Sequence, residues 1–417
     1  MIVGGGPSGL AAAIELRRWG VEPVTVVERE RQAGGIPRHS EHTGFGLRDM
    51  RRMLSGPRYA ERYRELATGA GAEIMTETMV TDWGKGRRLG VTGTAGRREI
   101  KPAVVILATG CRERPRSARL VPGSRPAGVM TTSTLQQFVH LRGERVGRRA
   151  VIVGAEHVSF SAVATLAHGG ASVAALVTDL PRHQSLTAFR LGAAIRYRAP
   201  VWTRSEVTEI RGMPRVEEVE ITDLESGRTR VVACDLVIFT ADWIPDHELA
   251  AMAGAELDRG TLGPLVDEEL RTTVRGVFAA GNLVHPAETA DACALTGRHA
   301  GAAAAAHLGG TMVRRATGWG EGWPEHVRVR AEPPLRWVVP GLLWSPGSEP
   351  RPSPPRGRFL LRSAAFLRAP RIEVRQAEAV LWSGRLRRLV PGRSASIPAA
   401  WTERVEPSAG PVTVEVK

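Results

Sequence analysis

The sequence predicts an α/β fold with two Rossmann-like dinucleotide-binding domains, followed by a small β-rich C-terminal module. Three observations predict it. Residues 1–28 read as strand, glycine turn, helix and second strand, which is the order of a βαβ unit. The same order of elements returns at residues 149–177. After residue 310 the pattern changes to proline-rich segments and to the two-residue alternation of strands.

The first βαβ segment is defined element by element. We predict a strand at Met1–Val3, a turn at Gly4–Gly9, a helix at Leu10–Trp19 and a strand at Val24–Glu28. The first strand has three residues where about five are usual. We therefore expect the natural chain to begin upstream of Met1.

The second βαβ segment begins at the β-branched strand Arg149–Val153 and continues through a helix that ends at His168. Further elements follow from periodicity and turn residues. They are a strand at Ser172–Val177, a hairpin between Arg211 and Phe239 with Gly227 in its turn, a strand at Leu236–Thr240 and a buried Ala-rich helix at Ala290–Leu308.

The C-terminal part is predicted from proline placement and strand periodicity. Proline does not fit inside a helix or a central strand, and five prolines fall within residues 345–356: Pro346, Pro350, Pro352, Pro354 and Pro355. We therefore predict a linker at 313–356. Because Arg371–Leu381 and Val412–Val416 alternate in the strand period, residues 357–417 are predicted to form a β-rich module.

Composition narrows the functional class. The chain of 417 residues has a net charge of +14 and a pI near 11.0, which raises nucleic-acid binding as a question. The arginines are scattered among Ala, Gly and Pro rather than gathered into one run. This favours a compositional bias over a nucleic-acid surface, while a partner with acidic patches stays open.

Cysteine content and hydropathy predict the compartment. Cys111, Cys234 and Cys293 form no C-x-x-C pair and no zinc spacing, so we expect a reducing compartment and no metal site. The sequence has no apolar stretch of roughly 18 residues and no signal-peptide pattern. We predict a cytoplasmic protein without a membrane span.

The glycine pattern of the first turn predicts a dinucleotide site. Gly4-x-Gly6-x-x-Gly9 stands between a strand and a helix, and Glu28 follows 19 residues after Gly9. Glycines permit the tight turn and the close approach of a pyrophosphate, which the helix N-terminus then stabilises. Glu28 is predicted to accept hydrogen bonds from the adenosine ribose.

Three later stretches resemble the FAD-binding half of the pyridine-nucleotide-disulfide oxidoreductase superfamily: Gly34-Gly35, Ala108-Thr109-Gly110 and GVFAAGN at 276–282. Residues 34–47 and 108–129 look like one branch of FAD-dependent oxidoreductases. That branch includes flavoproteins that accompany glycerol-3-phosphate dehydrogenase and the larger subunits of opine, hydroxyproline and hydrogen-cyanide-forming dehydrogenases. The resemblance covers roughly residues 1–310 and implies FAD as the cofactor.

The resemblance also implies roles for individual residues. The last motif usually ends in Gly-Asp, with the Asp on the flavin ribityl chain; here it is Gly281-Asn282, whose amide keeps hydrogen bonds without the charge. The helix opening at Thr289-Ala290 would point its N-terminus at the flavin pyrimidine edge. The predicted cofactor-binding residues are Gly4, Gly6, Pro7, Ser8, Gly9, Glu28, Arg29, Gly35, His39, Val80, Ala108, Thr109, Gly110, Gly281, Asn282, Thr289 and Ala290.

The second βαβ segment departs from a pyridine-nucleotide site. Its turn reads Gly154-Ala155-Glu156-His157-Val158-Ser159, so only the first glycine of the motif is present. The Glu156 carboxylate would repel a diphosphate. Asp179 is an alternative ribose ligand, although an Asp at a turn is more often a solvated cap. NAD(P)H binding is therefore doubtful, and electrons would pass through another acceptor or a partner subunit.

Two histidines and one cysteine are the remaining candidates for chemistry. His42 is predicted to be catalytic, taking a proton as a substrate loses hydride, and its alternative is a structural role. His39 is predicted to bond the FAD phosphates or the backbone. Ser40 stands where glycerol-type relatives tend to have Cys, which removes a thiol. Cys111 has Arg112 and Arg114 nearby but is predicted to be a packed thiol.

These observations predict a discontinuous FAD-binding domain at 1–115 and 240–312 and an NAD-like domain at 116–239. The predicted function is an FAD-dependent oxidoreductase that transfers hydride between a small organic substrate and the flavin. Two alternatives stay open. One is an NAD(P)H-dependent flavin reductase that feeds a partner protein. The other is a non-catalytic FAD-bearing subunit of a dehydrogenase complex.

Overall fold

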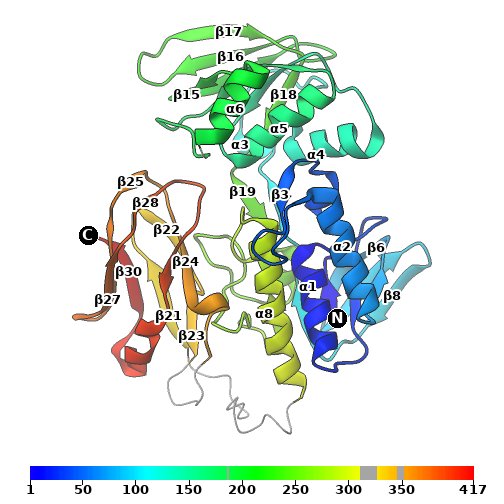
Figure 1. Ribbon diagram of the computed structural model, residues 1–417, viewed down its shortest axis with the longest axis vertical. Coiled ribbons are helices and arrows are strands. Elements are labelled where there is room, and N and C mark those ends of the chain that lie inside the picture. The colour runs from blue at the N-terminus through cyan, green and yellow to red at the C-terminus, as the bar shows by residue number, and fades with distance from the viewer. Residues whose placement is uncertain (186, 310–325, 345–351) are drawn as a thin grey trace. The chain divides into compact units, whose positions relative to one another are not determined.

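The computed structural model describes residues 1–185, 187–309, 326–344 and 352–417 (Figure 1). The described chain forms two units. The first unit consists of residues 1–38, 44–111 and 245–417, and the second of residues 39–43 and 112–244. The chain therefore passes into the second unit after Cys111 and returns after Ile244.

A parallel five-stranded sheet forms the centre of the first unit, in the order β20-β9-β1-β2-β5. Ile2 lies opposite Val26 on one side and Ile106 on the other, and its side chain is fully buried. The strands are β1 (Ile2–Val3), β2 (Thr25–Val27), β5 (Glu73–Met75), β9 (Val105–Leu107) and β20 (Val277–Ala279). The predicted βαβ unit at the start of the chain is confirmed.

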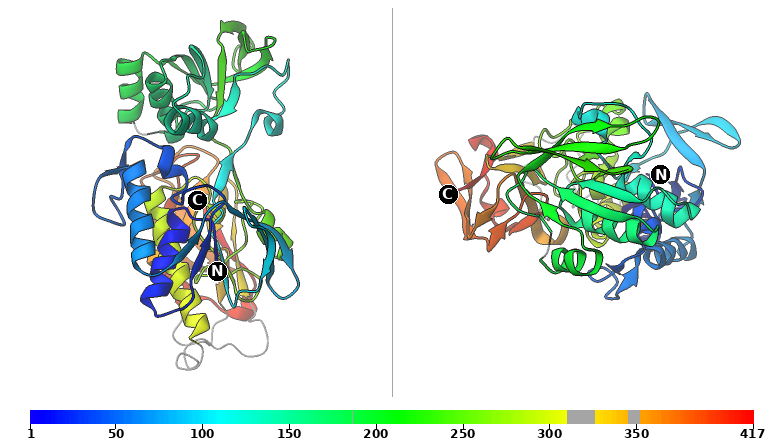
Figure 2. Two further views of the ribbon diagram at one scale, coloured as in Figure 1. Left: turned by 90° about the vertical axis from the view of Figure 1, so that its right-hand side faces the viewer. Right: turned by 90° about the horizontal axis from the view of Figure 1, so that it is seen from above.

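Three helices form a layer on one face of this sheet: α1 (Pro7–Arg18), α2 (Gly56–Gly69) and α8 (Ala290–Leu308) (Figure 2). Small residues let α1 and α8 approach closely. A Cβ on Gly297 would lie 2.0 Å from the Ser8 carbonyl oxygen, and one on Gly301 would lie 2.7 Å from that of Ala12. The Ala-rich segment predicted as a buried helix is thus α8, which packs against the helix of the glycine turn.

The first unit contains further short elements. An antiparallel sheet of β6, β7 and β8 packs Val80, Leu89 and Val91 into the main core. The bounds are β3 (Thr43–Phe45), β4 (Leu54–Ser55), β6 (Thr78–Gly84), β7 (Arg88–Gly93), β8 (Gly96–Ile100), β10 (Cys111–Glu113), β19 (Trp243–Pro245) and α7 (Glu248–Met252), where β3, β10 and β19 extend into the second unit.

The second unit has its own parallel sheet, in the order β11-β18-β12-β13-β14. Alternate residues of β12 enter different cores, because successive side chains point to opposite faces. Ala150 and Ile152 pack under helices, whereas Val151 packs under the meander β15–β17. The elements are α3 (Arg116–Arg119), β11 (Val129–Thr131), α4 (Thr132–Gln136), β12 (Arg149–Val153), α5 (His157–His168), β13 (Ser172–Val177), α6 (Thr187–Tyr197), β14 (Val201–Trp202), β15 (Ser205–Arg211), β16 (Glu218–Asp223), β17 (Thr229–Ala233) and β18 (Leu236–Phe239).

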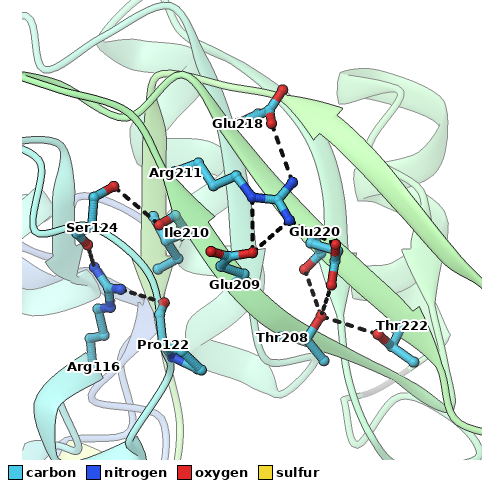
Figure 3. A network of polar contacts seen from close by, with 10 residues as sticks. All are labelled: Arg116, Pro122, Ser124, Thr208, Glu209, Ile210, Arg211, Glu218, Glu220 and Thr222. Carbon is cyan, nitrogen blue, oxygen red and sulfur yellow. Dashed lines mark hydrogen bonds and ion pairs between the residues drawn. The ribbon is translucent and has the colours of Figure 1, made fainter.

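Two arginines of the second unit, Arg116 and Arg211, are matched by oxygen acceptors (Figure 3). Arg211 lies opposite Glu218 across β15 and β16, and its guanidinium also contacts Glu209 at 2.5 Å and Glu220 at 2.9 Å. These carboxylates raise the pKa of Arg211. Arg116 donates to the carbonyl oxygens of Val121, Pro122 and Ser124. Charge compensation here follows the ordinary cross-strand rule.

The C-terminal module is a β structure with its own core around Phe359 and Trp401. Its strands are β21 (His326–Ala331), β22 (Leu335–Val339), β23 (Leu342–Trp344), β24 (Arg358–Ser363), β25 (Leu367–Arg368), β26 (Arg371–Gln376), β27 (Ala379–Arg385), β28 (Arg388–Leu389), β29 (Ala395–Pro398) and β30 (Val412–Val416). They form sheets ordered β23-β21-β30-β26-β27, β22-β24-β29 and β25-β28.

The segment predicted as a linker at 313–356 differs from this structure. Strands β21, β22 and β23 lie inside it and belong to the module, because Val327, Leu335 and Leu343 supply buried side chains to the module core. The five prolines that predicted a linker lie only at the end of the segment, within residues 345–356. Pro346 and Pro350, with residues 310–325, lie outside the described residues. The stretch Arg371–Leu381, predicted as strand, is split between β26 and β27.

A buried polar cluster joins the module to the rest of the first unit. Arg271 contacts Asp267 at 2.6 Å and lies 3.8 Å above the Trp344 ring. The Trp344 backbone N–H donates to the Glu268 carboxylate at 2.9 Å. Burial opposes ionisation of Asp267, but a hydrogen bond from His326 and the Arg271 charge outweigh it and lower the pKa of Asp267. Buried charges thus contribute to the attachment of the module, beside Trp337 and Val339, which pack into the main core of the first unit.

Glu268 makes the stability of this attachment dependent on pH. Burial raises the pKa of Glu268 from 4.5 to about 8, and the Asp267 charge adds to the effect. Between pH 4.5 and about 8, Glu268 keeps its proton in the folded chain but has lost it in the unfolded chain. The free energy of unfolding therefore falls as the pH rises through this range.

The parent chain is expected to lose on the order of a few kcal/mol of unfolding free energy between pH 4.5 and about 8, and Glu268→Gln is expected to remove this loss. Urea unfolding of both chains at several pH values would measure it. Asp267, Arg271, His299 and His326 are common to both chains and cancel in the comparison. Parallel pH profiles for the two chains would contradict the prediction.

Candidate functional site

The glycine turn after β1 is required by backbone packing. Gly4 has a φ of +102°, and a Cβ there would lie 2.4 Å from the Ala108 carbonyl oxygen. A Cβ on Gly9 would lie 1.9 Å from the Gly4 carbonyl oxygen. No other residue type fits these positions without moving the backbone. The turn brings the ends of β1 and β9 together with the start of α1.

The N-terminus of α1 is left uncapped by side chains. Gly6 occupies the N-cap position with no side-chain hydrogen bond, and Pro7 follows inside the first turn. The Ser8 hydroxyl is buried, and its oxygen has no hydrogen-bond partner among the described residues. Unpaired N–H groups and a positive dipole end at this point form an anion site. The turn therefore fits the diphosphate of a dinucleotide.

Glu28 is held directly beside this turn. One carboxylate oxygen accepts a hydrogen bond from the Gly5 N–H at 2.9 Å, and the other accepts one from the Glu30 N–H at 2.8 Å. Each carboxylate oxygen can accept more than one hydrogen bond, so capacity for a ligand hydroxyl is left. Its role toward the ribose stays a prediction.

The other predicted FAD motifs of the first unit converge on the same turn. Gly35 approaches Gly6, where a Cβ would lie 3.0 Å from the Gly6 Cα atom. Ala108 and Thr109 pack against Gly4. Gly281 lies against Ser8, with a Cβ position 2.8 Å from the Ser8 Cβ atom. Four segments far apart in the sequence thus line one site.

Asn282 forms part of the site by ordering its own loop. Its side-chain oxygen accepts a hydrogen bond from the Glu288 N–H at 2.8 Å, and its Nδ2 donates to the Glu288 carbonyl oxygen at 3.3 Å. An Asp at this position would lose the second contact because a carboxylate does not donate. The amide therefore closes a loop that runs directly into Thr289, the N-cap of α8.

Asp291 is a further residue of the site that was not predicted from the sequence. Its carboxylate accepts hydrogen bonds from the N–H groups of Gly46 and Arg48, at 2.8 and 2.9 Å. Asp49 in the same loop accepts hydrogen bonds from the Tyr59 and Tyr63 hydroxyls. The sequence signal for this role was an acidic residue in the first turn of the helix that follows Thr289. These contacts fix the 45–50 loop against the start of α8.

Some predicted residues lie elsewhere. His39 and His42 belong to residues 39–43, which are part of the second unit. His39 is buried, with Nδ1 3.3 Å from the Gln136 side-chain oxygen, whereas His42 is exposed, with Nδ1 3.0 Å from the Thr43 carbonyl oxygen. Arg29 is exposed, and Val80 is part of the main core. The roles assigned to these four residues stay predictions.

The corresponding turn of the second unit is closed by its own side chain. Glu156 occupies the N-cap of α5 and forms a capping box with Ser159. The Glu156 carboxylate also accepts a hydrogen bond from the Trp243 indole at 3.3 Å. Ser159, which stands at the third glycine position, bonds the Thr240 hydroxyl at 2.6 Å. The Glu156 carboxylate thus caps the N-terminus of α5, whereas the corresponding N-terminus of α1 has no capping side chain.

The three cysteines are unbridged; Cys111 is half-buried, and Cys234 and Cys293 are buried. Burial raises the pKa of Cys234 to about 12 and raises that of Cys293 as well. Burial therefore disfavours the thiolate, which is the reactive form, at these two positions. No cluster of side chains suited to a metal ion occurs among the described residues, and none of their helices meets the length and apolarity that a bilayer crossing requires.

Comparison with known proteins identifies the family. Residues 1–306 match the family model described as pyridine nucleotide-disulphide oxidoreductase. A ferredoxin–NADP reductase of Ignicoccus hospitalis is 27% identical over 292 residues, covering 68% of this chain and 89% of the relative. The A subunit of opine oxidase from Agrobacterium tumefaciens is 25% identical, covering 74% of this chain and 65% of the relative.

Solved structures show the same fold. Thioredoxin reductase of T. acidophilum matches with a TM-score of 0.61 and 21% identity, over 74% of this chain and 97% of that one. The family model ends at residue 306 and so does not include the β-rich module. The matched region contains the glycine turn, the Ala108–Gly110 loop and the Gly281 loop. The chain belongs to the FAD-dependent pyridine nucleotide-disulphide oxidoreductase family and is an oxidoreductase.

Proposed function

We propose that the first unit binds FAD and exchanges hydride with a small organic substrate, and that the second unit does not bind NAD(P)H. The contrast between the two helix N-termini carries this proposal. The α1 N-terminus has a glycine cap and no capping side chain, whereas the α5 N-terminus is capped by Glu156. Only the first of these leaves an anion site for a dinucleotide.

A partner subunit is proposed as the other electron-transfer component. If the second unit binds no nucleotide, electrons on the flavin must pass to another acceptor. Two of the relatives are named as subunits of oxidases, one of opine oxidase and the other of sarcosine oxidase. These names support an assembly in which the chain works beside a second protein. By the family resemblance, the substrate is a small organic molecule such as an amino acid, opine or polyol phosphate.

The residues of the first unit supply binding and orientation. The α1 N-terminus holds the diphosphate, and Glu28 holds the ribose. The Asn282 loop sets the entry of α8, whose N-terminus stabilises negative charge. A bound flavin would supply hydride acceptance. The role of His42 in taking the substrate proton stays a prediction, because residues 39–43 belong to the second unit.

An anaerobic absorbance titration of the FAD-loaded chain with NADH and NADPH tests this function. The oxidised-flavin band is expected to persist with both nucleotides, because Glu156 occupies the second anion site. Dithionite is expected to bleach the same sample, which shows that the flavin is reducible. Candidate substrates are then screened by bleaching.

Each alternative outcome has a defined meaning. Rapid bleaching by either nucleotide would overturn the interpretation of Glu156 and establish a nucleotide-linked reductase, the activity named for the Ignicoccus relative. A chain that retains no FAD after reconstitution would contradict the function itself. A flavin that binds but accepts electrons only from dithionite would favour a non-catalytic FAD-bearing subunit.

A further inference from the structure

Two segments of the C-terminal module form a narrow antiparallel ladder rich in arginine. Residues 367–371 pair with residues 385–389, and we call this pair the arginine ribbon. Arg368 lies opposite Arg388 and Arg371 opposite Arg385. Between them, the Ala369 N–H donates to the Arg387 carbonyl at 3.1 Å and the Leu386 N–H to the Pro370 carbonyl at 3.0 Å. Five of its ten residues are Arg and none is acidic.

These arginines are exposed and largely uncompensated. Arg368, Arg371, Arg385, Arg387 and Arg388 are all exposed. Only Arg371 has a carboxylate nearby within the described part of the chain, Glu373 at 3.5 Å. Arg393 adds to the group, since burial and the Arg388 charge lower the pKa of Arg393. The ribbon is thus a concentrated positive surface.

The ribbon contrasts with the cross-strand pairs of the second unit. There Arg211 faces Glu218, and three carboxylates surround one guanidinium (Figure 3). In the ribbon, two arginines face each other at two ladder positions. Like charges directly opposite destabilise a strand pair. A bound negative surface would relieve this repulsion.

We propose that the arginine ribbon is the docking surface for a carboxylate-rich face of a protein partner, the partner subunit of the proposed function. Arg is suited to this task because its planar guanidinium binds carboxylates in a bidentate manner. Arg is also enriched at the centres of protein interfaces. The proposal rests on the proposed function for the identity of that partner.

Size and surroundings favour a protein over a nucleic acid or a membrane. The five-residue ladder is about 15 Å long, which suits an interface centre better than a phosphate track. Val380 is the one exposed large hydrophobic residue in the described part of the module. The five apolar residues of the ribbon include only one that is exposed, the small Ala369. The ribbon therefore has no exposed aromatic ring for base stacking and no exposed large apolar side chain for insertion into lipid.

The test compares two variants with equal loss of charge. The ribbon variant carries Arg368→Gln, Arg385→Gln, Arg387→Gln and Arg388→Gln. The control variant carries Arg145→Gln, Arg148→Gln, Arg149→Gln and Arg228→Gln, at exposed positions of the second unit. The probe is labelled poly-L-glutamate of about 20 residues, which stands for a carboxylate-rich protein surface. Binding to the FAD-loaded chains is measured by fluorescence anisotropy at low and moderate salt.

The ribbon variant is expected to weaken poly-L-glutamate binding by about tenfold or more, and the control variant by about twofold or less. The melting temperature of the ribbon variant is expected to be unchanged or higher, since repulsion is relieved. Equal weakening in both variants would overturn the proposal. Tighter ribbon-dependent binding of a DNA duplex or of phosphatidylserine vesicles would also overturn it. Because no flavin reduction is measured, this result and that of the nucleotide titration are independent.

Discussion

Gly9→Ala is expected to weaken FAD binding strongly while leaving the second unit folded. The added Cβ would lie 1.9 Å from the Gly4 carbonyl oxygen, a contact that only a backbone shift relieves. That shift would open the turn that presents the α1 N-terminus to the diphosphate. Overpacking costs about 1–3 kcal/mol or more, so we expect FAD affinity to fall by about a hundredfold. Equilibrium dialysis and flavin absorbance after reconstitution would measure this.

Gly69→Ala is the matched control for this change. Gly69 ends α2 and has no positive φ, and a Cβ added there would have no atom within 4 Å. Ala is tolerated better than Gly in a helix by about 1 kcal/mol, so normal FAD retention is expected. If Gly9→Ala bound FAD as tightly as the parent chain, close packing at the turn would not be required for the site.

Arg271→Met is expected to be the most destabilising single change in the first unit outside the glycine turn. Arg271 and Asp267 are both nearly inaccessible, with side-chain exposures of 4% and 1%. Removing one member of a buried pair leaves an uncompensated charge, which costs about 3–5 kcal/mol. The substitution would also remove the guanidinium that lies over the Trp344 ring. Calorimetry is expected to show a melting temperature lower by roughly 10 °C for the first unit.

Two further variants separate burial from charge pairing. Arg328 contacts Glu256 at 2.6 Å, but both side chains are almost half-exposed; Arg328→Met is therefore expected to cost less than about 1 kcal/mol. Asp267→Asn combined with Arg271→Met is expected to recover most of the loss, because the nearly inaccessible Asp267 then carries no charge, and Glu269, the other carboxylate that contacts Arg271, is 27% exposed. A double variant as unstable as Arg271→Met alone would show that packing on Trp344, and not charge, is decisive.

Local patterns predicted several elements to the residue. Strands β12 and β13 and helix α8 have the predicted bounds, since each shows an uninterrupted pattern between clear turn or capping residues. The segment 313–356 was predicted less well. Strands β21 and β22 of this segment are stabilised by β30 and β24, which lie far along the chain. Pairing at that distance leaves no local signal.

The candidate site likewise combines residues that the sequence predicted with residues that only the structure identified. The sequence by itself determined the glycine turn and Glu28, because glycine spacing and one acid at a fixed distance are local consequences of how a chain surrounds a diphosphate. The tertiary structure alone decided that Asn282 closes its own loop and that Asp291 holds the 45–50 loop. It also placed the arginines of residues 367–371 opposite those of residues 385–389. Strand pairing sets which side chains become neighbours, and neighbouring charges then determine whether a residue is compensated or left to bind a partner.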